Sequence, residues 1–538
     1  MSGKSAREAV VSNTNIQYIF QKLDTEGSGY VSKEKLLSIL QQSGYSESSE
    51  ILTKMRACFS QHPELDRMDF YQLQEVLSFA SSVQIKKALA GQLRIQGFPE
   101  FCSQLQEIFQ AVGTLTGGTV EEKIPQLASA NPSDFSVAVC TVDAQQASFG
   151  DSGKLICALS LMHVATYLTC VDDCGETSVH KCVGKEPAGK GWENMSSLGS
   201  DGRPYNPLLP AGGLVTCAML RPALSYANRY KFIVDKWCAA CGIEFTAFNN
   251  CLFLSRRERA FYVRALAHMM KEAEVFPSSY VVDEEVEFFL QVGCLESSLN
   301  ELSVFAATIA NGGICPLSGK RVFSTAAVRS VLSLLVSCGM YDYSGEWAYR
   351  IGIPGKANSA GVILMVVPGI CGLAVYSPCL DEESGISYRG KLFAERFVDR
   401  FPFHPFDCIV EGESCFADLG ANGTLKKDPT NHKLVSNLSQ QVNIFYAAAE
   451  GDTYHVQHIL AMGQADVNAV DRFGRTALHL AAAEGHADVI SILLAHGATE
   501  VMDVFGHTPT DDAEKAGHAL AAEILASKGK IWESHLHL

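Results

Sequence analysis

Residues 362–376 read VILMVVPGICGLAVY and lie inside the longest uncharged run of the chain, 357–380. Two short apolar runs flank Pro368 and Gly369, a pair that is typical of a tight turn. We therefore expect a β-hairpin that is buried on both faces. The run is long enough to span a membrane, but a Pro-Gly pair at its centre argues against a transmembrane helix.

The surrounding sequence predicts a domain of about 300 residues that contains this hairpin. Val137–Val142 reads as a further strand and Leu155–Leu168 as a helix. Mixed helices and Gly/Pro-punctuated loops continue to about Phe406. Strands at both ends with helices between them predict an α+β or three-layer domain.

The segment before this domain has a helical pattern, with apolar residues at helical spacing from Ile16 to about Gln110. Within it, Asp24–Tyr30 reads DTEGSGY and resembles the start of an EF-hand loop. The twelfth position counted from Asp24 is Lys35, where calcium needs a bidentate glutamate. We expect a helix–loop–helix that does not bind calcium.

The last hundred residues carry an internal repeat with an offset of about 32 residues. Residues 471–479, DRFGRTALH, recur as 503–509, DVFGHTP, and each copy continues into an Ala-rich helix that ends at a Gly-His pair. A weaker copy begins at Ala447. The pattern resembles ankyrin repeats, which stack to share one core and bind proteins.

Composition limits the possible classes of function. The chain has 538 residues, 43 Lys+Arg and 59 Asp+Glu, a net charge of −16, and 18 Cys. The acidic balance argues against a nucleic-acid binder, and scattered cysteines suggest free thiols in a reducing compartment. Residues 1–15 lack the apolar core of a secretory signal, so we expect a cytoplasmic protein and leave a mitochondrial presequence open.

Three groups of residues could carry chemistry. Ser160 and His163 share one face of a helix, where an imidazole could accept a hydroxyl proton, although an incidental polar face is the alternative. Cys238 and Cys241 have dithiol spacing but close a helix, which favours a buried helix end. The cysteines and histidine at 170–182 lack a second C-x-x-C pair, so we predict no metal site.

Several longer motifs make the sequence similar to the animal glutaminases, and the resemblance covers about residues 15–530. They include IPQLA at 124–128, AATIANGG at 306–313, SCGMYDYSG at 337–345, and Lys356. The resemblance implies an EF-hand-like all-α domain at 12–112, a glutaminase domain at 119–408 and an ankyrin solenoid at 436–530. The central α+β fold would be that of the serine β-lactamases and penicillin-binding proteins.

The family hydrolyses L-glutamine to glutamate and ammonia through a serine acyl-enzyme, with the serine in an S-x-x-K motif. Carried over by position, the nucleophile is Ser160, but the lysine position holds His163. Tyr341 matches a pocket tyrosine, and Ser359 stands where a backbone N–H completes the oxyanion hole. Lys123 replaces a tyrosine that shuttles a proton in the family, and the other substrate-binding positions are replaced by Pro210, Arg256, Val263 and Phe289.

These replacements lead to one main hypothesis and two alternatives. The main hypothesis is a pseudoenzyme that serves as an assembly or regulatory partner, in a homo- or hetero-tetramer and through its ankyrin repeats. The first alternative is a slow glutaminase in which His163 is the base for Ser160 and L-glutamine the substrate. The second is an enzyme of changed specificity in which Arg256 meets an anionic substrate. All three predict no cofactor, no nucleic acid and no membrane span.

Overall fold

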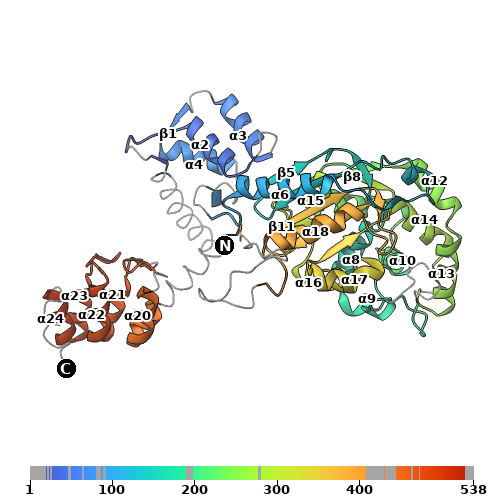
Figure 1. The fold of residues 1–538 in the computed structure, drawn as a ribbon. Helices are drawn as coiled ribbons and strands as arrows, with labels where there is room; N and C mark the ends of the chain where they lie inside the picture. The colour runs from blue at the N-terminus through green and yellow to red at the C-terminus, as the bar shows by residue number, and fades with distance from the viewer. Residues whose placement is uncertain are drawn as a thin grey trace. The chain divides into compact units, whose positions relative to one another are not determined.

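A computed structural model describes the protein, and its residues fall into two compact units, 1–430 and 431–538. The predicted boundaries at 12, 408, 436 and 530, and the N-terminal segment used to predict location, lie outside the described residues. Figure 1 shows the elements of each unit, which are considered separately below. The described residues are 20, 23–24, 27–45, 50–62, 66–79, 87–88, 92–188, 198–276, 280–407, 429–430, 444–461, 465–471 and 473–527.

A five-stranded antiparallel sheet forms the centre of the first unit, with strand order β5-β4-β11-β10-β9. The predicted hairpin is confirmed, since β10 pairs with β11 from Val362↔Tyr376 to Val367↔Cys371 and every residue of both strands is buried. None of the described helices is long and apolar enough to cross a membrane. The strands are β4 (Ser136–Thr141), β5 (Gln146–Phe149), β9 (Gly355–Ala357), β10 (Val362–Val367) and β11 (Cys371–Tyr376).

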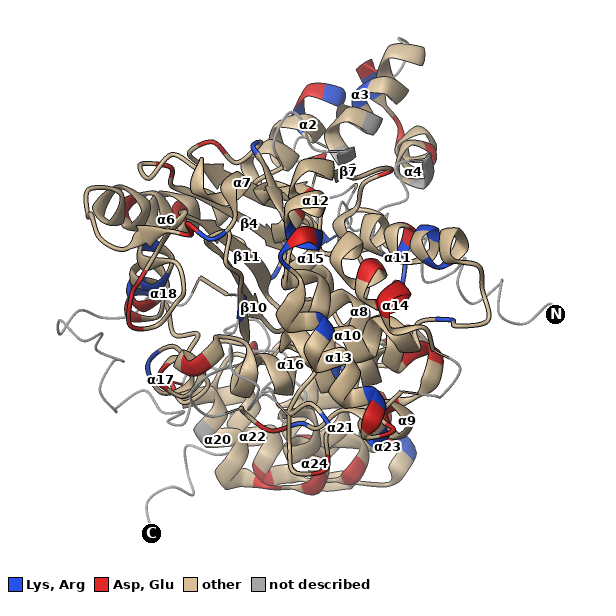
Figure 2. Cartoon of the chain, turned by 90° about the vertical axis from the view of Figure 1, so that its right-hand side faces the viewer, with Lys and Arg blue, Asp and Glu red and all other residues tan. Residues whose placement is uncertain are grey.

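Helices cover both faces of this sheet, which confirms the predicted three-layer arrangement (Figure 2). On one face α15 (Leu299–Ala310) crosses β11 and β4, and it fits closely because Gly372 has no side chain to meet the Ala306–Ala307 backbone. On the other face lie α6 (Phe98–Gly113) and α18 (Tyr388–Arg400). Alternate residues of β10 therefore enter two separate hydrophobic cores.

Further helices pack around α15 and complete the larger core of the domain. Two small sheets, β6-β8-β7 and β12-β3, lie beside them. The bounds are α7 (Pro125–Ala128), α8 (Leu161–Cys174), α9 (Glu176–Cys182), α10 (Pro210–Met219), α11 (Tyr226–Cys241), α12 (Asn250–Glu258), α13 (Phe261–Glu272), α14 (Val282–Val292), α16 (Thr325–Cys338), η3 (Tyr341–Tyr343), α17 (Ser344–Arg350), β3 (Thr119–Val120), β6 (Leu155–Cys157), β7 (Ala247–Phe248), β8 (Leu295–Ser298) and β12 (Cys379–Leu380).

The helix predicted over Leu155–Leu168 begins later than expected. Residues 155–157 form β6, which pairs with β8, and the helix α8 starts only after Ser160. The prediction was wrong here because an apolar run cannot distinguish a short buried strand from the first turn of a helix. Cys238 and Cys241 do occupy the last turn of α11, which Gly242 ends with φ +70°, as predicted.

The described N-terminal part of this unit contains three helices and a pair of short strands. The helices are α2 (Lys33–Gln42), α3 (Glu50–Gln61) and α4 (Phe70–Phe79), and the short strands β1 (Val31–Ser32) and β2 (Arg67–Met68) pair between the loops. The Asp24 carboxylate accepts hydrogen bonds from the Ser28 and Gly29 N–H groups. The likeness of the loop at 24–30 to an EF-hand remains a prediction. Residues 25 and 26 of this loop lie outside the described residues.

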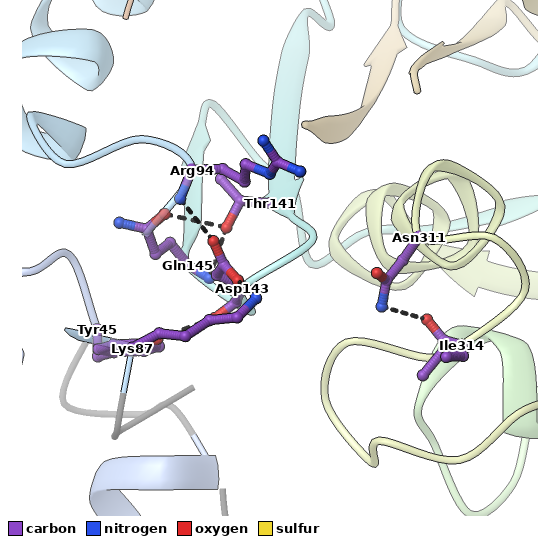
Figure 3. A network of polar contacts seen from close by, with 8 residues as sticks. All are labelled: Tyr45, Lys87, Arg94, Thr141, Asp143, Gln145, Asn311 and Ile314. Carbon is purple, nitrogen blue, oxygen red and sulfur yellow. Dashed lines mark hydrogen bonds and ion pairs between the residues drawn. The ribbon is translucent and has the colours of Figure 1, made fainter. Parts of the chain in front are cut away.

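A buried carboxylate joins this helical part to the sheet, at the turn after β4 (Figure 3). Asp143 accepts a hydrogen bond from the Arg94 N–H at 2.7 Å and lies 2.6 Å from the Lys87 ammonium. The Tyr45 hydroxyl donates to the Asp143 carbonyl, and the Gln145 amide donates to the carbonyls of Ser43 and Ile95. These bonds fix the helical part directly on the central domain.

The second unit consists of paired helices, and these confirm the repeat found in the sequence. The Thr476 hydroxyl and N–H both contact Nδ1 of His479, and Thr508 and Asp511 form the equivalent cap one repeat later. These bonds hold each turn against the following helix. The helices are α20 (Thr453–Ala461), α21 (Ala477–Glu484), α22 (Ala487–Ala495), α23 (Pro509–Ala516) and α24 (Ala519–Ala526).

Candidate active site

Ser160 stands at the start of α8, directly after a strained turn. The preceding residue, Leu159, has φ +48° and donates its N–H to the Gly293 carbonyl, while β6 pairs with β8 just before it. A positive φ in a leucine costs on the order of 1–2 kcal/mol. The positive φ of Leu159 and its bond to Gly293 therefore fix Ser160 in a backbone position that differs from that of an unstrained helix start.

Two residues far along the chain contact the Ser160 hydroxyl. Nζ of Lys356, on β9, lies 3.3 Å from Oγ, and the Tyr341 hydroxyl lies 3.2 Å from it. Ser160 donates its own proton to the Ala357 carbonyl, so the other two groups donate to Oγ in this arrangement. The Lys356 ammonium also lies over the Tyr341 ring, 4.5 Å from its centroid.

Lys356 is buried without a carboxylate partner among the described residues, and burial lowers the pKa of its ammonium from 10.5 to about 7. Close to neutral pH, a large fraction of this lysine is thus an uncharged amine that can accept a proton. Lys356 stands in a motif that carries the family resemblance, but the sequence predicted no role for it, because 196 residues separate it from Ser160.

Asn358 connects the segment before Ser160 to the loop that follows β9, and sequence reasoning did not single it out. Its amide donates to the carbonyls of Cys157 and Ala158, immediately before Ser160. Its Oδ1 accepts from the N–H groups of Ala360 and Val362, which follow Ser359 in the same loop. Asn358 therefore fixes the Ser359 backbone relative to the Ser160 turn.

His163 does not contact the Ser160 hydroxyl through any hydrogen bond among the described residues. Its Nδ1 lies 3.0 Å from the Leu208 carbonyl, so the neutral ring donates there, and its Nε2 faces Gly213, where no side chain intervenes. Burial lowers the pKa of His163 to about 3, and the charges of Lys356 and Arg256 act in the same direction. The geometry therefore does not favour the predicted Ser160–His163 pair as nucleophile and base.

Arg256 and Phe289 converge with His163 on a gap that Leu159, the residue before Ser160, also lines. The Phe289 ring stacks on the imidazole with centroids 5.4 Å apart. Arg256 on α12 donates from Nη1 to the Leu290 carbonyl at 3.1 Å and contacts the Cys294 sulfur, passing Gly293, which leaves room for it. The gap that these three side chains line has no volume that a water molecule could enter.

The remaining predicted residues lie on separate elements. Pro210 is the first residue of α10, and the partly buried Val263 of α13 packs against the larger core. Lys123 is exposed, and its carbonyl accepts a hydrogen bond from Arg259. Ser359 lines a cavity of about 300 Å³ together with Cys157, Lys154, Asn249 and Glu296.

A second cavity, of about 420 Å³, lies beside Tyr341 and is lined by Asn206, Leu209, Val336 and Ala348 among others. Each cavity thus includes a residue predicted to belong to the site, Tyr341 in one and Ser359 in the other. The described residues contain no group of three His, Cys, Asp or Glu that could hold a metal ion. The chemistry that the arrangement supports is nucleophilic attack by a serine whose proton a lysine accepts.

Comparison with known proteins gives two family matches. A sequence model described as glutaminase matches residues 118–406, which is more than half of the chain, and a model described as ankyrin repeats, three copies, matches residues 444–534. The rat liver isoform of glutaminase, named mitochondrial, is 34% identical over 506 residues, covering 93% of this chain and 82% of the relative. A glutaminase of a Nostoc strain is 31% identical over 61% of this chain and 96% of its own.

Solved structures agree on the central fold. A protein described as a probable glutaminase, ybaS, has a TM-score of 0.55 and 28% identity, covering 57% of this chain and 98% of its own. The structure titled Mglu in its native form has a TM-score of 0.53 and 30% identity, covering 57% and 73%. The central domain therefore has the β-lactamase-like fold that the resemblance implied.

Proposed function

The chain belongs to the glutaminase family, and we propose that it is a member that no longer hydrolyses glutamine at the family's rate and acts as an assembly or regulatory partner. The closed gap that Leu159 and His163 line, on either side of Ser160 in the sequence, supports this proposal most directly. Three of the replaced positions, His163, Arg256 and Phe289, line that gap, and it does not admit even a water molecule. A substrate headgroup would need both space and polar partners there.

Electrostatics and lost hydrogen bonds support the same conclusion. In the family a carboxylate faces the α-ammonium of glutamine, and Arg256 would repel that ammonium instead. Pro210, Val263 and Phe289 offer no side-chain hydrogen bond in place of the polar groups they replace. Each lost charge-assisted hydrogen bond costs about 1.5–3 kcal/mol, and a lost general base removes about 10²–10⁴ in rate. These effects are not additive, but together they remove several orders of magnitude of activity.

The ankyrin unit supports a role in protein binding, because such stacked repeats present an extended surface for partners. We propose that the protein joins a homo- or hetero-oligomer, a tetramer with an active glutaminase being the form to test. Its proposed location is the cytoplasm, with the mitochondrion as the alternative because two relatives are named mitochondrial isoforms. Fractionation and co-purification with an active glutaminase would test both statements.

The two alternatives have less structural support. A slow glutaminase that uses His163 as base conflicts with the Leu208 contact and with the pKa of about 3. An anionic substrate bound by Arg256 would have to compete with the Leu290 carbonyl in a gap that is closed. L-glutamine remains the substrate to test first, since it is the substrate of the family.

The decisive experiment is ammonia release from glutamine by the purified full-length protein. We expect no release above that of a matched Ser160→Ala preparation. Release near the rate of an active relative, lost in Ser160→Ala, would falsify the proposal. A second variant restores the family residues at the replaced positions: Lys123→Tyr, His163→Lys, Pro210→Asn, Arg256→Glu, Val263→Asn and Phe289→Tyr. If these replacements alone account for the lost activity, its rate of ammonia release should exceed that of the wild type by at least about 10³-fold.

A further inference from the structure

The Ser160 hydroxyl keeps three polar partners, although the gap that the preceding residue, Leu159, lines together with His163 and Phe289 is closed. The contacts from Ser160 Oγ to Lys356, Tyr341 and Ala357 all lie between 3.1 and 3.3 Å, and none of these residues lines the closed gap. A buried amine without a carboxylate partner costs stability, so its place beside a hydroxyl is typical of a reactive site. This contrast raises the question of what the serine can still attack.

We propose that Ser160 is a functioning nucleophile toward acyl donors that lack an amino-acid headgroup, with Lys356 as its general base and Tyr341 as the hydroxyl that relays the proton. This inference goes beyond the proposed function, because it concerns a different class of substrate. It also assigns the base to β9, whereas the sequence offered His163 as the base only in the alternative of a slow glutaminase.

The distances distinguish Lys356 from His163 as the base. Nζ of Lys356 reaches Oγ of Ser160 directly, whereas Nδ1 of His163 is committed to the Leu208 carbonyl. A general base must lie within hydrogen-bond reach of the proton that it accepts, and among the described residues only Lys356 combines that reach with a titratable amine.

The surroundings of Lys356 keep it poised to lose its proton near neutral pH. The titratable groups around it are Cys338 at the end of α16, Tyr341 on η3 and His163 on α8. The charge of Arg256, like that of Lys356, lowers the pKa of His163. Burial lowers the pKa of Lys356 to about 7, and Cys338 opposes this only in part. Among the described residues, the partners of the Lys356 ammonium are the Ser160 hydroxyl, the Ala357 carbonyl and the Tyr341 ring, and no carboxylate holds the charged form.

The proposed reaction is a balanced acyl transfer. Neutral Lys356 takes the Ser160 proton while Oγ adds to the carbonyl carbon of an ester, and the alkoxide leaving group departs with that proton, passed on through Tyr341. Water then adds to the acyl-serine and gives its proton to Lys356. The bond from the acyl carbon to Oγ breaks, and Oγ regains the proton. The net reaction is ester plus water to carboxylic acid plus alcohol.

The cavity beside Tyr341 indicates the substrate class. It holds about 420 Å³, and Pro187, Leu209, Val336 and Ala348 give it largely hydrocarbon walls. Among its lining residues only Asp342 carries a charge. A short uncharged ester fits this lining better than an amino acid does, because an amino acid needs partners for both its ammonium and its carboxylate.

A fluorophosphonate probe tests the proposal on the full-length protein, because Oγ displaces fluoride from it only when the serine is activated. We expect one adduct, mapped to Ser160 by mass spectrometry, with a labelling rate that rises tenfold per pH unit up to about pH 7 and then levels off. Lys356→Met should slow labelling about 10²-fold or more at pH 8 and remove the inflection. Ser333→Ala, an exposed serine on α16, is the matched control and should label at the wild-type rate.

Short p-nitrophenyl esters then test turnover, which Ser160→Ala should abolish. An adduct on any other serine, or a labelling rate for Lys356→Met equal to that of the wild type, overturns the proposal. If Lys356→Met does not fold, the wild-type pH profile decides instead, since no inflection between pH 6 and 8 also overturns it. Ammonia release from glutamine is a separate measurement, so the two proposals can fail independently.

Discussion

Asp143 and Lys356 are both almost completely buried, with 0% and 1% of their surface exposed, but they have very different partners. Asp143 is held by the Lys87 ammonium and the Arg94 N–H, so its charge is compensated where it lies (Figure 3). Lys356 has hydroxyl, carbonyl, ring and thiol neighbours but no carboxylate partner among the described residues. A compensated buried charge stabilises a fold, whereas an uncompensated one costs stability and is typical of a reactive site.

The first test of this comparison uses another compensated pair, Arg229 and Glu285, which are buried and joined by two hydrogen bonds of 2.8 and 2.9 Å. Arg229→Met should destabilise the central domain by about 3–5 kcal/mol, because it leaves Glu285 buried without a partner. Urea unfolding followed by tryptophan fluorescence measures this, since Trp237 and Trp347 are buried in that domain.

The matched control is the double change Arg229→Met with Glu285→Leu. It should recover most of the loss, because an apolar pair of similar size avoids the unpaired charge. An equal loss in both variants would mean that packing, and not charge compensation, determines the result.

The second test removes the charge of Asp143. Asp143→Asn should cost about 2–3 kcal/mol, because the carboxylate bonds to Lys87 and to the Arg94 N–H are both weakened. Limited proteolysis should then cut the helical part of the first unit more readily than in the wild type. Lys87→Met should cost less, since Lys87 is 38% exposed and Asp143 keeps its bond to Arg94. Equal losses would contradict this interpretation.

The third test concerns Lys356, whose replacement should raise the free energy of unfolding instead of lowering it. The pKa of Lys356 is about 7 in the folded protein and about 10.5 in the unfolded chain, so the unfolded chain binds more protons between these values. The stability of the wild type should therefore rise with pH from about 7 to 10.5 and be lowest, as far as this group is concerned, below pH 7. Lys356→Met should be more stable than the wild type at pH 6.5 by several kcal/mol, and the difference should shrink toward pH 10. Thermal melts across this range would show a pH-independent difference if the reasoning is incorrect.

The smallest effect concerns the turn that carries Asp143. Ala144 has φ +67° and is buried, a conformation that glycine adopts more easily. Ala144→Gly should stabilise the protein by about 0.5–1 kcal/mol, whereas Ala147→Gly in the strand β5 should destabilise it by a similar amount. The difference between their denaturation midpoints is the measurement, and the same sign for both would contradict the assignment of strain.

The sequence predicted the parts of the molecule whose signals are local. The hairpin at 362–376 and the repeat that joins 471–479 to 503–509 follow from periodicity and turn residues within a few positions, and the structure has both. The predicted start of the helix α8 was wrong, because β6 is a strand only through its pairing with β8, which lies far along the chain. Local patterns contain no information about such a partner.

The candidate site shows the same limit. Ser160 and Tyr341 came from motif positions, and the structure brings their hydroxyls together. The family position made His163 a candidate base, but the Leu208 carbonyl that occupies its Nδ1 lies on another segment. Lys356 could be quoted from the sequence, yet only the fold places it beside Ser160.

The pairing of β4 with β11 has a consequence for how the chain folds during its synthesis. β4 lies near the start of the central domain and β11 near its end, so β4 leaves the ribosome long before this partner exists. Until then only β5 can pair with it, and its other edge, apolar along most of its length, stays open to wrong partners. A chain that stops before residue 371 should therefore aggregate instead of giving a smaller working domain.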